Sequence, residues 1–263
     1  MRKHLIILVA FALSLALGVR AQEYHGTTGL LHAPSAVMDS TGTFRGSFTY
    51  VDKLFLPPQL WYYGDGIPFN SMCYTIGMTL FPWLEMSYTG TLVKIHPNKA
   101  KREPLGYYNE DRHINVKLRP LKEGRYWPAV AIGWDDVGGL NVFKTKGWTT
   151  NNFFENLYGV LSKHLEIHGH VLGAHLAYRY YPSDKNAARR GLAGGITYAP
   201  YLGEKLQHPR AWLQRPRVIV EWDGVGVNAG VDVLLWRHLF VQAALIHGSG
   251  FTGGLGYHYR IKY

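Results

Sequence analysis

The sequence predicts an all-β protein, an antiparallel transmembrane β-barrel of about 12 strands. Three observations favour this fold. The chain ends in a segment where aromatic and polar residues alternate, many other segments share this two-residue period, and nothing after residue 21 is apolar enough for a transmembrane helix. A closed barrel is the other structure that satisfies every backbone hydrogen bond inside a membrane.

The composition fits an exported membrane protein. Charged residues make up 17% of the chain, below the roughly 25% of ordinary soluble domains, while aromatic residues make up 14% and there are 30 glycines. The net charge is +10, and +7 without Arg2, Lys3 and Arg20. In an exported protein this charge favours contact with lipid phosphates or polysaccharide rather than nucleic acid. The lone Cys73 excludes an internal disulfide.

Residues 1–21 have the pattern of a secretory signal peptide. Arg2 and Lys3 precede an almost wholly apolar run, Leu5–Leu17, and small residues lead to a cleavage site after Ala21. The run is too short to span about 30 Å of hydrocarbon as a helix, although an uncleaved anchor is an alternative. With no cysteine near the cleavage site, no lipid anchor is expected. The predicted location is the outer membrane of a Gram-negative bacterium.

Residues 22–41 form a separate N-terminal segment. Its stretch Gly26–Met38 is rich in small and turn-forming residues and has neither a strand nor a helix period. Three arrangements are open for it: a short plug in the lumen, a segment along the periplasmic rim, or a flexible leader.

Residues 42–263 form the predicted barrel. Because side chains of a strand point alternately to its two faces, a two-residue period gives one lipid-compatible face and one polar face. Twelve segments qualify, an even number as bacterial single-chain barrels require. The predicted strands are 43–50, 72–81, 84–92, 111–119, 127–135, 155–164, 168–181, 191–200, 217–223, 225–235, 239–247 and 251–263.

The C-terminal segment shows the period most clearly. Phe251, Leu255, Tyr257, Tyr259, Ile261 and Tyr263 share one face, and Thr252, Gly254, Gly256, His258, Arg260 and Lys262 share the other. A chain that ends on an aromatic strand residue resembles the signal recognised by the barrel-assembly machinery. We therefore expect that machinery to bind through Tyr263.

The connections give a second signal, since outer-membrane barrels have short periplasmic turns and longer outer loops. Short connections are predicted at Pro82, 121–126 and 165–167, and long ones at 51–71, 94–110, 136–154 and 182–190. The stretch 201–216 should be periplasmic but is long and basic. Either the alternation of loops slips there, or this stretch has a role on the periplasmic side.

The alternation assigns ten charged side chains to the lumen. They either pair with one another into a salt-bridged, stabilising interior, or line a polar path for sugars or ions. The ten are Arg45, Glu85, Lys117, Arg119, Arg179, Glu221, Asp223, Asp232, Arg260 and Lys262.

Five aromatic residues in the long loops are candidates for contact with a glycan. Aromatic rings stack on sugar rings, and they equally anchor a barrel at the membrane interface. The five are Trp61, Tyr62, Tyr63, Tyr107 and Tyr108.

No catalytic or metal site is predicted. His247 and Ser249 have the spacing of lipid-deacylating barrels and are expected to point outward, but no third group is evident to orient the histidine, and a tight glycine turn explains HGSG equally well. His164, His168, His170 and His175 cluster around one hairpin, with His168 and His170 expected on one strand face. No carboxylate accompanies them at ligand spacing. No cofactor is expected.

Short motifs are spread over most of the mature chain: GLLHAPSAVM at Gly29–Met38, Asp111–Lys117 followed by YWPAVAIGWDDVG from Tyr126, Gly194-Gly195, and VEWDG from Val220. They resemble motifs of the YjbH-like, exopolysaccharide-associated outer-membrane proteins, with Trp222 where tyrosine is usual. This chain is far shorter than the long members of that family.

The resemblance implies an accessory role in the production or export of extracellular polysaccharide and supplies no catalytic residues. The partners it implies, beside outer-membrane lipid, are an acidic polysaccharide and periplasmic export proteins. The alternatives are a small-solute outer-membrane channel and a lipid-deacylating enzyme that uses His247 and Ser249.

Overall fold

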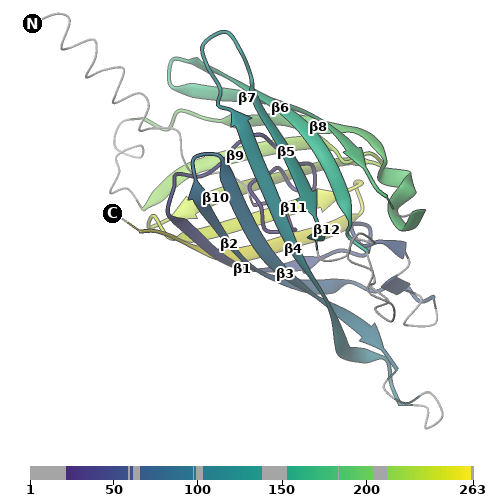
Figure 1. Ribbon diagram of the computed structural model, residues 1–263. Coiled ribbons are helices and arrows are strands. Elements are labelled where there is room, and N and C mark those ends of the chain that lie inside the picture. The colour runs from purple at the N-terminus through teal and green to yellow at the C-terminus, as the bar shows by residue number, and fades with distance from the viewer. Residues whose placement is uncertain are drawn as a thin grey trace, which may run out of the picture.

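The computed structural model describes residues 22–58, 60–61, 66–96, 98, 103–137, 153–182, 184–203 and 212–261. Twelve antiparallel strands close into one barrel, in which each strand pairs with its neighbours in the sequence and β1 pairs with β12 (Figure 1). The purple segment that precedes β1 lies inside the ring of strands.

The strands are between seven and sixteen residues long. They are β1 Thr43–Val51, β2 Ser71–Phe81, β3 Leu84–Ile95, β4 Gly106–Leu121, β5 Ala129–Asp135, β6 Asn156–Ile167, β7 His170–Tyr180, β8 Gly191–Ala199, β9 Leu213–Trp222, β10 Val227–Leu235, β11 Leu239–Ile246 and β12 Gly250–Arg260. A 3₁₀ helix, η5 Asp184–Arg189, precedes β8.

The predicted all-β, antiparallel twelve-stranded barrel is confirmed. Three connections differ clearly from the prediction. β9 begins at Leu213, four residues before the predicted strand 217–223, so the basic connection is shorter than 201–216. β4 begins at Gly106, so much of the stretch expected to be a loop up to residue 110 is strand. β6 continues to Ile167, and the turn is His168-Gly169, where φ is 51° and 81°. Two consecutive positive φ angles give the tight hairpin turn that matches the twist of paired strands.

The two ends of the barrel carry different connections. We call the end where β1 starts and β12 finishes the terminal end; its connections are 82–83, 122–128, 168–169, 200–212 and 236–238. The opposite, loop end carries 52–70, 96–105, 136–155, 181–190, 223–226 and 247–249. Because every strand pairs with the next, the basic connection after β8 lies at the terminal end, and the predicted alternation does not slip there.

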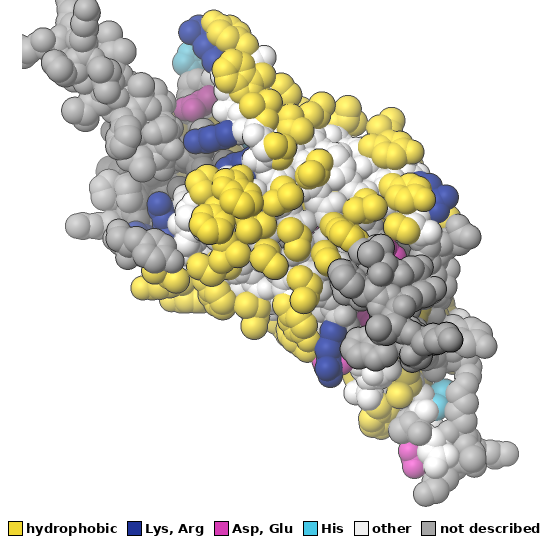
Figure 2. Space-filling model, in the orientation of Figure 1, with side chains coloured by type: hydrophobic (Ala, Val, Ile, Leu, Met, Phe, Trp, Pro, Cys, Tyr) yellow, Lys and Arg dark blue, Asp and Glu magenta, His cyan; other side chains and the backbone are white. Residues whose placement is uncertain are grey.

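The outer surface of the barrel is apolar over most of its height. Strand residues at alternate positions expose large hydrophobic side chains, as the yellow surface in Figure 2 shows; they include Ile76, Ile114, Ile132, Leu161, Leu176, Ile196, Val220, Val231, Leu245 and Leu255. An exposed apolar surface of this extent is unusual for a protein surrounded by water. No helix among the described residues has the length and apolarity to cross a membrane.

Tryptophan occurs at four of the five connections of the terminal end. These four are Trp83, Trp127, Trp212 and Trp236, each about half exposed, and the connection without one is the turn 168–169. Trp236 belongs to a tight turn in which Trp236 and Arg237 both have positive φ, 48° and 70°. A ring of tryptophan at one level is typical of the aromatic belt at a membrane–water interface.

Candidate functional site

The candidate site is the lumen, which residues 22–39 occupy; we call this segment the plug. Leu30, Ala33 and Ala36 have no exposed surface, and the most exposed of its hydrophobic and polar side chains, Tyr24, reaches only 6%. Bridges between Gln22 and Thr28 and between Gly29 and Pro34 fold the plug back on itself. Of the three arrangements open from the sequence, the structure therefore has the segment in the lumen.

Glu221 of β9 binds the backbone of the plug. Its carboxylate accepts the amides of Leu31, His32 and Ala33, at 2.9, 2.9 and 3.0 Å, and also the Asn228 side-chain amide at 2.8 Å. Successive backbone N–H groups that converge in this way form an anion-binding concavity. Glu221 thus recognises a backbone conformation and not a plug side chain.

The opposite wall donates to plug carbonyls. Lys117 Nζ donates to the carbonyls of Thr28 and, at 3.1 Å, Val37. The His25 carbonyl accepts from Asn115 Nδ2 and the Thr89 hydroxyl, both at 2.6 Å. A buried backbone carbonyl needs a hydrogen-bond donor. These plug carbonyls are not paired with a barrel strand, so the wall side chains donate to them instead.

Charged residues of the wall also pair with one another. The Glu85 carboxylate binds the Arg45 guanidinium and lies 3.4 Å from Lys117 Nζ, and all three side chains are fully buried. Arg45 also binds Asp39 of the plug at 2.5 Å. Three charges removed from water are tolerated here because each has an opposite charge within reach.

At the loop end, three connections meet on Asp223; we call Arg189, Asp223 and His247 the latch. Asp223 Oδ2 lies 3.4 Å from Arg189 Nη1 and 3.2 Å from His247 Nε2. Arg189 also donates to the Leu54 carbonyl and bonds to the His32 ring at 3.1 Å. The latch therefore joins η5, the loop that contains Leu54, the short loops 223–226 and 247–249, and the plug.

Burial alone would raise the pKa of Asp223, but the Arg189 guanidinium and the amides of Gly226 and Val225 outweigh it and lower that pKa below its usual 3.8. The charged form is thus favoured in the folded state. Burial, followed by Arg189 and Arg179, lowers the pKa of His32 well below its usual range, so this plug histidine is neutral.

The latch should weaken in acid. A carboxyl group whose pKa is lowered in the folded state stabilises that state above its unfolded pKa, and this contribution is lost as the pH falls through the folded pKa. We expect the protection of the amides of residues 223–226 against hydrogen exchange, relative to their intrinsic rates, to fall as the pH is lowered below about 4. In Asp223→Asn, exchange should be faster throughout, after correction for intrinsic rates, and the acid step should vanish; an unchanged step would contradict this assignment.

An apolar cap closes the lumen above the plug. Three rings contact one another here: the His32 ring centre lies 4.8 Å from that of Phe55 and 5.0 Å from that of Tyr24, and the Phe55 and Tyr24 ring centres are 5.9 Å apart. Three more buried side chains belong to the same apolar cluster: Leu56, Leu60 and Phe154. The Phe154 ring also contacts that of Tyr24. Residues 52–58, 60–61 and 153–155 of the loops therefore lie over the lumen and exclude water from the plug.

Arg179 also belongs to this network, because it is buried and donates to the carbonyls of Asp223 and, at 3.4 Å, His32. Other residues assigned to the lumen lie outside the network. Asp232 binds Arg217, which was not predicted from the sequence, at 2.7 Å. Arg119 is half-buried at the terminal end and donates to the Pro82 carbonyl. Arg260 is exposed at the end of β12, where no wall surrounds it. Lys262 and Tyr263 lie outside the described residues.

The aromatic candidates have three different environments. Trp61 packs against the apolar cap. Tyr107 and Tyr108 lie on β4, in a hairpin with β3 that projects beyond the rim in Figure 1, and not in a loop. Tyr107 donates to the Asn70 carbonyl at 2.7 Å, whereas Tyr108 is 57% exposed. Tyr62 and Tyr63 lie outside the described residues.

Two sequence expectations about histidines were wrong. His247 does not point outward: it lies in a tight turn with Gly248, both with positive φ, and its ring faces the buried Asp223. His168 also lies in a turn, so it shares no strand face with His170. His164 binds Glu123 at 2.7 Å and His175 contacts Ser162 at 2.8 Å. No group of three or more His, Cys, Asp or Glu residues in the described part could hold a metal ion.

Comparison with known proteins now identifies the family. The YjbH family model, described as exopolysaccharide biosynthesis protein YbjH, matches residues 21–161, more than half of the chain. The chain belongs to the YjbH family. It is also 28% identical over 152 residues to the uncharacterized lipoprotein YjbH of Escherichia coli (strain K12), an alignment that covers 54% of this chain. The alignment covers only 19% of that relative's length, so this YjbH-family chain corresponds to about a fifth of it.

The YjbH-like motifs noted in the sequence have structural roles. The motif Gly29–Met38 is the second half of the plug. In the VEWDG motif, Glu221 binds the plug and Asp223 holds the latch. Four residues that contact the plug or Asp223, or that support those contacts, were not predicted from the sequence: Asn115, Ser162, Asn228 and Arg189. The strand period already placed Asn115 and Asn228 on the inward face, whereas nothing in the sequence pointed to Arg189.

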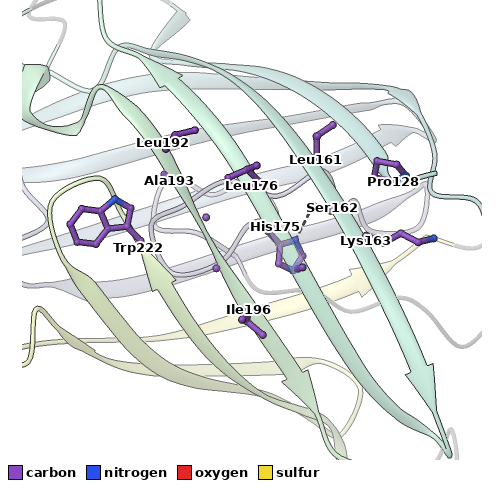
Figure 3. Close-up of a pocket in the computed structure, with 13 residues that line it drawn as sticks. Pro128, Leu161, Ser162, Lys163, His175, Leu176, Leu192, Ala193, Ile196 and Trp222 are labelled. Carbon is purple, nitrogen blue, oxygen red and sulfur yellow. Dashed lines mark hydrogen bonds between the residues drawn. The ribbon is translucent and has the colours of Figure 1, made fainter. Parts of the chain in front are cut away.

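The outer wall of this YjbH-family barrel has a shallow groove over β6–β8 with a volume of about 460 Å³. Leu161, Leu176, Leu192, Ile196 and Trp222 surround it, as Figure 3 shows. Gly194 and Gly195, which have no side chains, also line the groove. Its lining is almost entirely apolar, in keeping with the rest of the outer surface.

Proposed function

We propose that this protein spans the outer membrane of a Gram-negative bacterium and is an accessory in exopolysaccharide production or export. The observation that carries the proposal is its membership of a family described as exopolysaccharide biosynthesis proteins. The apolar outer surface and the tryptophans at the terminal end support the membrane location. In this arrangement the terminal end faces the periplasm and the loop end faces outward.

The filled lumen favours an accessory over an open channel for small solutes. Plug side chains are buried along its whole length, and the apolar cap covers the plug at the loop end. The inward ring of His247 likewise gives the lipid-deacylating alternative no support, because that chemistry needs the histidine beside the serine at the lipid-facing rim.

The proposed partners are an acidic polysaccharide at the outer loops and periplasmic export proteins at the terminal end, with the barrel-assembly machinery binding through Tyr263. Tyr108 is the best placed of the aromatic candidates to stack on a sugar ring. It is exposed on the projecting β3–β4 hairpin, where Lys94 lies 4.8 Å from the ring of Tyr107. A cation beside exposed aromatic rings suits an acidic sugar.

The test is the amount of surface and periplasmic polysaccharide in a strain that lacks this chain, compared with its parent. We expect the surface glycan to fall, or to accumulate in the periplasm, and wild-type protein to restore it. Tyr108→Ala should restore it several-fold less well, because a lost aromatic contact costs about 0.5–1.5 kcal/mol.

Tyr178→Ala is the matched control. Tyr178 has the same exposure, 57%, but lies on the outer face of β7. Equal polysaccharide in the deletion strain and its parent would overturn the proposed function. Equal loss in the two tyrosine variants would instead assign Tyr108 to the membrane interface.

A further inference from the structure

Wall residues contact the plug mainly through its backbone. Glu221 accepts three plug amides, Lys117 and Asn115 donate to plug carbonyls, and the Ser162 hydroxyl accepts the Ala36 amide at 2.8 Å. These carboxylate, ammonium, amide and hydroxyl groups are also the ones that bond to sugar hydroxyls.

Most ion pairs of the wall do not depend on the plug, whereas Arg45 also pairs with Asp39 of the plug and Glu221 accepts plug amides. Glu85 pairs with Arg45 and Lys117, Asp232 with Arg217, and Asp223 with Arg189, all within β-strands or outer connections. The plug contains two acidic residues. Only Asp39 pairs with a wall cation among the described contacts, while burial and then Asp135 raise the pKa of Glu23 well above its usual range. Withdrawal of the plug would therefore leave these ion pairs of the wall in place. Arg45 would lose Asp39, and Glu221 would keep Asn228 while its other acceptor positions became free for a ligand.

The lumen has room for another chain. Barrels of about eight strands are filled by their own side chains, and those of 16–18 strands leave an aqueous channel. This twelve-stranded barrel encloses 18 residues of plug besides its inward side chains. The plug joins β1 through Ser40-Thr41-Gly42, and Gly42 has a φ of 80°, a conformation that glycine adopts without strain.

We infer that the lumen wall around Glu221, Lys117, Asn115 and Ser162 is a binding site for a hydroxyl-rich glycan strand, which the plug occupies until it is displaced. The assignment rests on the proposed role in polysaccharide export for the identity of its ligand. The wall has buried charges of both signs, nearly balanced, so it fits the uncharged, hydroxyl-bearing parts of such a strand.

The test is ion conductance of the refolded full-length protein in planar lipid bilayers, with maltohexaose as the probe. Glu221→Ala removes the acceptor of three plug amides, and we expect it to raise the open time at least tenfold over wild type. Millimolar maltohexaose should then block the current. Asp232→Ala is the matched control, because it removes a buried wall carboxylate that has no hydrogen bond to the plug among the described contacts.

A disulfide should reverse the effect. With Cys73→Ser throughout, Ala36→Cys and Ser162→Cys would join plug and wall; we expect this lock to silence the Glu221→Ala channel until a reductant is added. Ser162→Ala with Thr89→Ala gives a second, uncharged way to loosen the plug. Heat-modifiable migration on gels establishes that each variant is folded.

Folded loosened variants without current would overturn the displaceable plug. A current that maltohexaose leaves unchanged, or that polyethylene glycol of equal size reduces equally, would overturn the glycan site. The proposed function fails separately, on the polysaccharide content of the deletion strain, and that failure would leave the conductance results unaltered.

Discussion

Glu85→Ala is expected to destabilise the barrel by about 3–5 kcal/mol, the cost of leaving buried charges without their partner. Glu85 has no exposed surface and neutralises two cations, Arg45 and Lys117. Its carboxylate also accepts the Thr28 amide at 2.5 Å, so its loss removes a plug contact as well. Asp39 can still neutralise Arg45, which leaves Lys117 as the group that bears most of the cost.

The measurement is the urea midpoint of unfolding of the refolded barrel in lipid vesicles, followed by tryptophan fluorescence. Glu110→Ala is the control: its pair with Arg112 lies on the projecting hairpin with Arg112 64% exposed, and exposed ion pairs contribute little. The double variant Glu85→Ala, Lys117→Met should recover part of the loss. A Glu85→Ala midpoint equal to that of Glu110→Ala would show that the lumen is hydrated enough to solvate both cations.

Gly195→Ala is expected to prevent formation of the folded barrel. An ideal Cβ at this position would lie 2.4 Å from the Val220 carbonyl oxygen, and at Gly194 it would lie 2.2 Å from the His175 carbonyl oxygen. Both obstacles are backbone atoms of paired strands, so no side-chain rotation relieves them. The β8–β9 pairing extends only from Gly194 to Tyr198 on β8, and separating it would open the barrel wall.

The measurement is the heat-modifiable band of folded protein in outer membranes and after refolding in detergent. Gly159→Ala is the matched control, because a Cβ there would meet no atom within 4 Å. We expect wild-type amounts of folded Gly159→Ala and little or no folded Gly194→Ala or Gly195→Ala. Normal folding of both latter variants would mean that β8 shifts to accept a side chain.

The two-residue period was sufficient to predict the strands because local backbone geometry alone decides to which face of a strand a side chain points. The predicted strand at 239–247 differs from β11 by one residue, and 43–50 differs from β1 by one. Larger errors occurred where strands extend past the alternating core. β4 begins five residues early because the hairpin with β3 continues beyond the rim, where the two faces no longer separate lipid from lumen.

The inward position of Glu85, Lys117 and Glu221 also followed from the period, but their partners did not. Glu221 and the amides it accepts are about 190 residues apart, and Arg189 and Leu54 are 135 apart. No local pattern encodes such contacts, because closure of the sheet brings these residues together. The predicted direction of the His247 ring was wrong for a related reason. The strand register predicted an outward ring, but the residue lies in a turn with positive φ, which directs the ring toward Asp223.

The sequence by itself determined the strand count, the apolar outer face and the polar inner face, since each depends on an alternation that every strand displays separately. Only the tertiary structure decided that residues 22–39 fill the lumen. Their small side chains and lack of period are equally compatible with a flexible leader, and they become ordered because wall side chains from β2–β4, β6, β7, β9 and β10 satisfy their backbone amides and carbonyls or pack against them. Those side chains converge on one volume only when the barrel has closed.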